Sequence, residues 1–180
     1  MPTATATGNA TMDLTATKPD LHTISLFVRN KPGVLVRVAL VFSRRGFNIE
    51  SLVVSPGKTD DFSRMTITSS GDPETLEQVV KQLAKLVDVV HAIDHTGQAV
   101  IDVEIGLFKV KVPLDDRTAL LQLVEHYNGK VVDYAQDSII VRVSGNSEKL
   151  DAFEALLGQW EILELVRSGK IVMARGLEET

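Results

Sequence analysis

Residues 23–38 have the sequence TISLFVRNKPGVLVRV, in which a strand pattern passes directly into a helix pattern. Polar and apolar residues alternate over Thr23–Val28, as they do in a strand that buries one face. The break at residues 30–33 contains a proline and a glycine, and apolar residues then recur at spacings of three and four from Val34 onward. A basic turn followed by Gly46 is typical of a helix end. The sequence therefore predicts a strand, a short loop and an amphipathic helix.

Two further strand patterns and a second helix pattern follow. Ile49–Ser55 and Phe62–Ser69 flank a turn-rich segment and predict a hairpin. Asp72 and Pro73, followed by an acid, predict the capped start of a helix. Val87–Ile93 predicts the last strand. The order strand, helix, strand, strand, helix, strand is the split βαβ unit of ferredoxin-like folds.

The second half of the chain repeats this order. The sequence SGDPETL at residues 70–76 aligns with SGNSEKL 74 residues further along, and in both places a strand end runs into a capped helix. The elements predicted here are a strand at Ile105–Val112, a helix at Arg117–Tyr127, strands at Val131–Ala135 and Ser138–Ser144, a helix at Glu148–Leu157 and a strand from Ile162. The fold class predicted is therefore α+β, with two tandem ferredoxin-like βαββαβ domains.

These patterns divide the chain into three segments. Residues 1–20 are rich in threonine and alanine and carry almost no large apolar side chain, so burial cannot offset the entropy of ordering them, and we expect a flexible segment. Residues 21–97 form the first predicted domain. Residues 98–180 form the second.

The composition excludes several classes of function. Of the 180 residues, 44% are hydrophobic and 24% charged, which is typical of a globular protein. The net charge of -5 provides no basic field for nucleic acid, and the absence of cysteine excludes disulfides and thiolate chemistry. No apolar run approaches the roughly 20 residues of a membrane helix, and the N-terminus has no secretory signal pattern. We expect a soluble, cytoplasmic protein that binds neither nucleic acid nor membrane.

The loop at residues 30–33 is the candidate binding site. It precedes a helix, so free backbone N–H groups and the positive end of the helix can hold a carboxylate there. Gly33 lets a ligand approach the backbone, and the side chain of Asn30 offers a donor and an acceptor. Such a loop can bind a free amino acid, and we expect the fold to bring Asn48 near it. The alternatives are that Asn30 is a helix N-cap and that Asn48 lies in a left-handed turn, with no ligand at either.

Two runs, residues 30–38 and 42–52, closely resemble the ACT domain of acetolactate synthase small subunits. The resemblance continues at residues 63–67 and 82–89, and it resumes in the second half at residues 149–153, 167–169 and 175–176. It implies an N-terminal ACT domain and a C-terminal ACT-like domain. It also implies a regulatory subunit, without catalytic activity of its own, in branched-chain amino acid biosynthesis. Such a subunit binds and activates the catalytic large subunit and confers feedback inhibition by valine or another branched-chain amino acid.

The resemblance also implies particular site residues. The valine-binding positions of the family match Asn30, Gly33 and Asn48, with backbone N–H groups of Val34 and Leu35, and the site lies where two ACT domains meet in a homodimer. No cofactor is expected in this chain, whereas thiamine diphosphate, Mg²⁺ and FAD are expected in the catalytic subunit. One departure is at Ile101–Glu104, which lacks the basic residue that family members often carry before this strand.

Other readings are less favoured by the residues present. His91 and His95 lie on a predicted strand, where this spacing separates them by ~13 Å, too far for a shared metal. The acid pairs at residues 60–61 and 115–116 are expected to be solvated caps and turns. An RNA-binding ferredoxin-like protein needs aromatic residues on its central strands, and the strand at residues 63–68 has none. A free-standing ACT regulator of another target is disfavoured by the matching C-terminal half.

Overall fold

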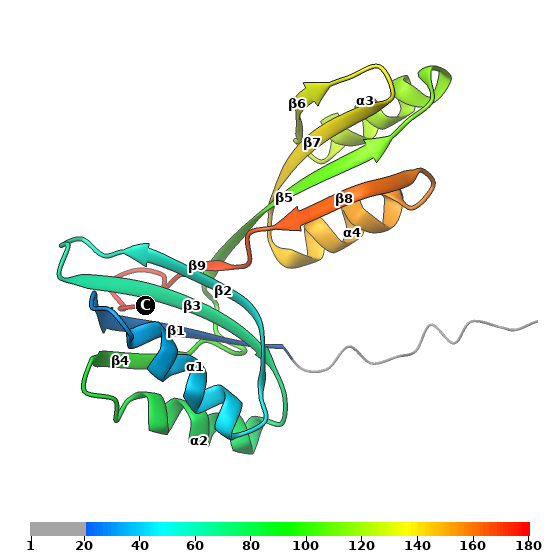
Figure 1. Cartoon of the computed structure of the whole chain (residues 1–180). Helices are drawn as coiled ribbons and strands as arrows, with labels where there is room; N and C mark the ends of the chain where they lie inside the picture. The colour runs from blue at the N-terminus through cyan, green and yellow to red at the C-terminus, as the bar shows by residue number, and fades with distance from the viewer. Residues whose placement is uncertain (1–20) are drawn as a thin grey trace, which may run out of the picture.

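The computed structural model describes residues 21–180, which form two halves joined by one long strand (Figure 1). The predicted flexible segment, residues 1–20, lies outside the described residues. The first half consists of β1 (Leu21–Arg29), α1 (Val34–Arg44), β2 (Asn48–Pro56), β3 (Phe62–Ser70), α2 (Pro73–Leu83) and β4 (Val89–Asp94). The second half consists of β5 (Ile101–Lys111), a 3₁₀ turn (Leu114–Asp116), α3 (Arg117–His126), β6 (Lys130–Tyr134), β7 (Ser138–Gly145), α4 (Ser147–Leu157), β8 (Glu161–Arg167) and β9 (Ile171–Met173).

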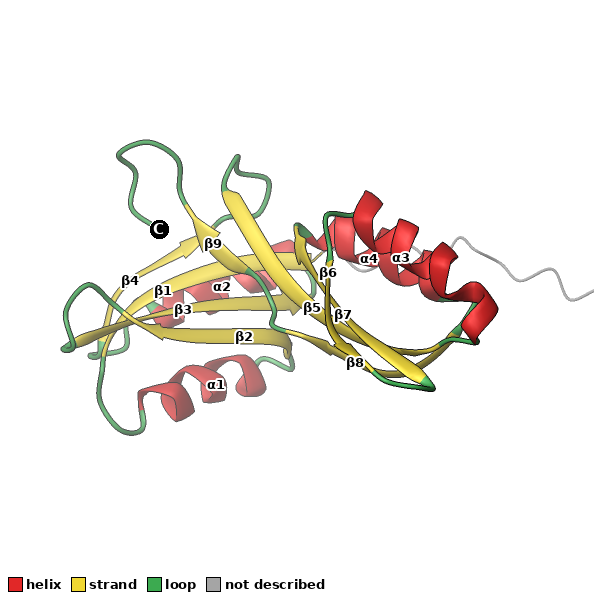
Figure 2. Cartoon of the chain, turned by 90° about the horizontal axis from the view of Figure 1, so that it is seen from above, coloured by secondary structure: helices red, strands yellow, loops and turns green. Residues whose placement is uncertain are grey.

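The strands of both halves pair in the same order. The first sheet has the order β2-β3-β1-β4, the second has the order β6-β7-β5-β8, and all of these pairs are antiparallel. Two helices cover one face of each sheet (Figure 2). This arrangement is the ferredoxin-like fold, present twice. The predicted fold class is confirmed.

Each half has its own hydrophobic core between its sheet and its helices. Ile24 and Leu26 of β1 alternate toward the helices and pack with Phe42 of α1, as the strand and helix patterns predicted. In the second half, Phe108 of β5 meets Phe153 of α4 edge to face, with ring centroids 5.0 Å apart. The two cores are separate clusters, so each half buries its own apolar stripe.

The other face of the first sheet is polar, and chain segments far along the sequence cover it. The hydroxyl of Ser25, which is buried, lies 2.7 Å from Nε2 of His95 in the loop after β4. The main-chain oxygen of Thr180 accepts hydrogen bonds from His91, at 2.9 Å, and from the guanidinium of Arg64. The last residues of the described chain therefore return to the first half after completing the second.

Two details of the second half differ from the sequence prediction. Strand β5 begins at Ile101 rather than Ile105, and the short strand β9 was not predicted. The two differences have one cause, because β9 pairs with the start of β5 at Ile101 and Val103 and so extends it. A run of three residues is too short to give a recognisable alternation of polar and apolar residues.

Replacing Phe153 by alanine tests the core of the second half. The ring is fully buried against Phe108 and Tyr127, so its removal leaves a cavity that the helix cannot close. We expect Phe153→Ala to lower the free energy of unfolding by about 3 to 5 kcal/mol in urea denaturation. Leu114→Ala is the control, because Leu114 is 74% exposed and its loss should change that value by less than about 0.5 kcal/mol. Equal effects of the two substitutions would contradict this packing.

Candidate functional site

The first turn of α1 has no side-chain cap. Its N-cap residue is Gly33, at φ 82°, a left-handed conformation that glycine adopts at little cost. The helices α2 and α4 instead begin with Asp72 and Asn146, whose side chains accept hydrogen bonds from the first turn. The alternative that Asn30 is the N-cap of α1 is therefore wrong, and the backbone donors of this turn remain available.

The N–H groups at the start of α1 can hold an anion. Within the described chain, the N–H of Val34 reaches the carbonyl of Lys31 only at 3.4 Å, and the N–H of Leu35 has no backbone acceptor. Both groups lie at the positive end of the helix. The side chain of Val34 is buried in the core, whereas that of Leu35 is exposed on the surface.

Asn30 presents a carbonyl oxygen to the surroundings of this loop. Its side-chain nitrogen Nδ2 donates to the main-chain carbonyl of Asp60 at 3.0 Å, and its backbone N–H donates to the carbonyl of Asp61 at 2.8 Å. A carbonyl can only accept, so the orientation of the Asn30 amide is fixed by chemistry. Its oxygen Oδ1 has no hydrogen-bond partner among residues 21–180 and is free to accept from a ligand.

Asn48, the first residue of β2, is oriented in the same way. Its Nδ2 donates to Oε1 of Glu50 at 3.1 Å, and an ionised carboxylate can only accept, so Oδ1 of Asn48 is again left as a free acceptor in the described structure. Within residues 21–180, Asn128 is the one non-glycine residue with positive φ. The alternative that Asn48 lies in a left-handed turn is therefore wrong.

The two asparagines lie at opposite ends of α1. Asn48 pairs with Ser70 at one end of the sheet, whereas Arg29, next to Asn30, pairs with Phe62 at the other. The 11 residues of α1 between them span ~16 Å, more than one free amino acid can bridge. The expectation that one chain brings Asn48 near the first loop is wrong, because β2 starts where α1 ends.

A hollow lies beside Asn48 at the C-terminal end of α1. Its volume is about 470 Å³, and its lining includes the apolar side chains of Phe42, Phe47 and Ile49 together with Ser43. The hollow is shallow, and polar atoms make up more of its surface than apolar atoms do. The Asn30 end of the helix thus offers backbone donors, and the Asn48 end offers a shallow hollow with polar and apolar lining.

The two histidines rejected as a metal pair, His91 and His95, each have partners within the protein. His91 stacks on Phe27, and His95 lies between Ser25 and Gln98, so the two histidines face different surroundings. No group of three or more possible metal ligands occurs among residues 21–180. No helix in this part of the chain is long and apolar enough to cross a membrane.

Comparison with known proteins identifies the family of the chain. Residues 24–91 match the family described as the AHAS small subunit-like ACT domain, and residues 103–176 match the family described as the small subunit of acetolactate synthase. A probable acetolactate synthase small subunit of Archaeoglobus fulgidus is 45% identical over 86% of this chain and 97% of its own. The small subunit of Haemophilus influenzae is 42% identical over 85% of this chain and 94% of its own. The chain belongs to the acetolactate synthase small-subunit family.

A solved member of this family shares the whole arrangement. The crystal structure of the acetolactate synthase small subunit from Thermotoga maritima has a TM-score of 0.77 and 38% identity, and the match covers 87% of this chain and 98% of that one. The chain is accordingly a regulatory small subunit with an ACT domain in its first half. Its second half is the part that matches the second small-subunit family model.

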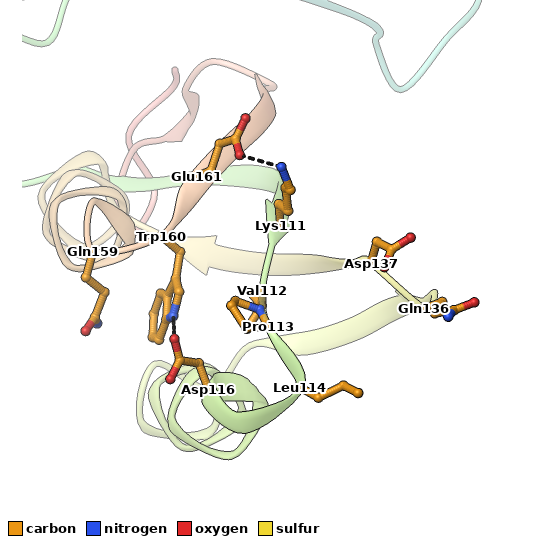
Figure 3. A pocket seen from close by; sticks show the side chains of 10 residues that line it. All are labelled: Lys111, Val112, Pro113, Leu114, Asp116, Gln136, Asp137, Gln159, Trp160 and Glu161. Atoms are coloured by element: carbon orange, nitrogen blue, oxygen red, sulfur yellow. Dashed lines mark hydrogen bonds and ion pairs between the residues drawn. The ribbon is translucent and has the colours of Figure 1, made fainter.

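The second half of this small subunit has a pocket at the place that corresponds to the first loop (Figure 3). The pocket, of about 690 Å³, lies where β5 runs into α3. Trp160 donates from Nε1 to Oδ2 of Asp116 at 3.3 Å, and Lys111 pairs with Glu161 at 3.0 Å. Asp137 adds a third carboxylate to the lining, so the pocket disfavours the carboxylate of an amino acid. Sequence analysis missed Trp160, because a lone aromatic residue between a helix and a strand carries no pattern.

Glu50, two residues after Asn48, was also missed by sequence analysis. It is the extra residue of a β-bulge, because the pairing of β2 with β3 shifts between Ile49 and Ser51. Oε1 of Glu50 accepts from the hydroxyl of Ser70 at 2.8 Å as well as from Asn48. These hydrogen bonds, that of Ser70 first, lower the pKa of the Glu50 carboxyl below its ordinary value of 4.5. A bulge has no signature in a single sequence.

Substitution of Ser70 tests this network. Because the carboxyl pKa is lowered in the folded chain, the stabilisation that the Glu50 carboxylate contributes is present above the unfolded pKa and is lost as the pH falls through the folded value. We expect Ser70→Ala to raise the pKa of Glu50 toward 4.5 in a carboxyl NMR titration. Ser55→Ala is the control, because Ser55 is an exposed serine on β2, the strand of Glu50, and it should leave the titration unchanged. An unaltered pKa in Ser70→Ala would contradict the assignment.

Proposed function

We propose that this small subunit binds valine, or another branched-chain amino acid, between two copies of its ACT domain and thereby regulates the catalytic subunit of acetolactate synthase. The observation that carries the proposal is the orientation of the two amides. Asn30 and Asn48 both direct their nitrogens at groups that only accept, which leaves two carbonyl oxygens for a donor. The N–H groups at the start of α1 supply the complementary donors.

This set of groups matches a free amino acid. The N–H groups of Val34 and Leu35 and the exposed backbone at Gly33 bind the carboxylate, and the two Oδ1 atoms accept from the ammonium group. The hollow beside Asn48 receives the branched aliphatic side chain. Each end of α1 supplies half of what the ligand needs.

Two copies complete the site when they pair along the α1 and β2 edge. Strand β2 is an edge strand, and Figure 2 shows α1 lying along the same edge. Exposed apolar side chains gather there, among them Leu35, Leu40 and Val54. A two-fold axis across β2 runs the second copy in the opposite direction, which brings Asn48 of that copy to the hairpin that holds Asn30. Homodimer formation and effector binding are then the same contact.

Regulation acts on a separate chain. The relatives are small subunits of acetolactate synthase, which supports a catalytic large subunit as the partner. In this proposal that large subunit, and not this chain, carries thiamine diphosphate, Mg²⁺ and FAD. This chain activates that subunit, and valine inhibits it by binding one arrangement of the complex more tightly, with a coupling of about 1 to 3 kcal/mol. We assign effector binding to residues 21–97 and contact with the catalytic subunit to residues 98–180.

Reconstitution with the catalytic subunit tests the function. We expect this chain to raise acetolactate formation and valine to reverse the increase, with alanine weaker by about fifteenfold because it buries two fewer carbon groups. Asn30→Ala should weaken valine binding by about tenfold or more in calorimetry, since it removes an acceptor for a charged group. Lys58→Ala, in the hairpin that Asn30 contacts, should bind like the wild type. Unchanged affinity and inhibition in Asn30→Ala would remove this residue from the site.

A mixture of two variants tests whether the site spans two copies. Asn30→Ala and Asn48→Ala each damage both sites of their own homodimer. In a mixed dimer, one site carries both substitutions and the other carries neither, so one of the two sites of each mixed dimer should regain wild-type affinity. Calorimetry after the two variants are unfolded and refolded together measures this recovery. A site contained within one copy would give no recovery, because every site would carry one substitution.

A further inference from the structure

The two halves touch where the turn after β8 crosses β2. At Gly169 in this turn, an added Cβ atom would lie 2.8 Å from Cβ and 2.9 Å from Oγ of Ser51, closer than a side chain can approach. Gly169 has φ +81°, a conformation that suits glycine. The backbone of the second half therefore rests directly on the second strand of the ACT domain.

On the side of the second half, this turn is fixed firmly. Ser168 exchanges two hydrogen bonds with Ile105 of β5, one from its backbone N–H at 2.9 Å and one to its hydroxyl at 3.0 Å. The preceding residue, Arg167, binds Glu104 of β5, which is 6% exposed, and Asp151 of α4. The turn is therefore tied to β5 and α4 of the second half.

On the side of the ACT domain, the contact lies within the network of the proposed effector site. Ser51 follows the bulge residue Glu50, which binds Asn48, and the hydroxyl of Ser51 lies 2.6 Å from that of Thr68 on β3. A cleft of about 450 Å³ opens beside the contact between the two halves. Its lining includes Glu50 and Ser70 from the ACT domain and Glu104, Asp151 and Arg167 from the second half.

We propose that the contact between Ser51 and Gly169 is the joint through which effector binding at Asn48 changes the placement of the second half. The proposal rests on the proposed function and adds a path of regulation to it. Asn48 lies three residues from Ser51 on the same strand, and the bulge between them lets the strand bend locally. Because packed contacts switch between discrete arrangements, a shift of β2 moves the turn that rests on it. The cleft provides the space for that movement.

The variant Gly169→Ala tests the joint in the full-length chain. The added methyl group pushes the turn away from Ser51 and leaves the effector residues untouched. We expect calorimetry to give a valine affinity within about threefold of the wild type, whereas half-inhibition of the reconstituted enzyme needs at least tenfold more valine. Gly176→Ala is the matched control, because Gly176 has φ +70° but nothing within 4 Å of an added Cβ. It should retain wild-type inhibition.

A compensating change separates the contact from backbone strain. Ser51→Gly removes the atoms that the new methyl group meets, so Ser51→Gly combined with Gly169→Ala should recover inhibition to within about threefold of the wild type. Should Gly169→Ala fail to fold, Ser51→Val enlarges the contact from the other side, and the same loss of inhibition with retained affinity is expected.

Three results would overturn the joint. The first is wild-type inhibition in Gly169→Ala, or in Ser51→Val where that variant replaces it. The second is an equal loss of inhibition in Gly176→Ala. The third is no recovery of inhibition in the double variant. Failure of the proposed function looks different, because the wild-type chain itself would then bind no valine. The valine affinity of the wild type, measured first, distinguishes the two failures.

Discussion

Strand β5 is the element on which the arrangement of this molecule depends. Its end, from Gly106 to Lys111, is the central strand of the second sheet, and its start pairs with β9 beside the first half. A single stretch of 11 residues with continuous main-chain hydrogen bonding thus carries the connection between the halves. Both halves have separate cores, so the contact between them depends on this strand, on the turn at Gly169 and on the hydrogen bonds of Thr180 with Arg64 and His91.

The acidic residues at the start of β5 take part in this connection. The segment Ile101–Glu104 contains two acids and no basic residue. In the structure Asp102 faces Lys170 at 3.8 Å and Glu104 binds Arg167, so both acids pair with the segment that leads back to the first half. Burial and the hydrogen bonds of Glu104 and Asp151 act on Arg167 in opposite directions, and the hydrogen bonds prevail, so the pKa of its guanidinium is raised. Asp102 and Glu104 therefore help to hold this segment against β5.

The sequence was sufficient for the fold because each element carries its own periodicity. The alternation over residues 23–28 and the apolar spacing from Val34 predict β1 and α1, and the repeat 74 residues further along predicts the second half. Periodicity does not show at which end of the sheet an element begins. Asn48 was expected near the first loop, although a helix that leaves one end of a sheet must deliver the next strand to the other end.

Other features of the site were beyond prediction for a different reason. The bulge at Glu50, the approach of Gly169 to Ser51 and the short strand β9 arise from contacts between residues far apart in sequence. A single sequence records the residue types of such contacts but not their partners. The resemblance to a family supplied candidate residues, and the structure supplied the orientation of their amides.

Under the proposed function, the separation of Asn30 and Asn48 by the length of α1 has a consequence for effector sensing. A ligand that needs both residues cannot be held by a monomer. Its apparent affinity therefore depends on the concentration of the protein as well as on the intrinsic affinity of the site. Binding of the ligand in turn favours the dimer by the same free energy. In dilute solution the chain would appear insensitive, and in the assembled enzyme, where copies are held close together, the same residues would respond at far lower concentrations of the amino acid.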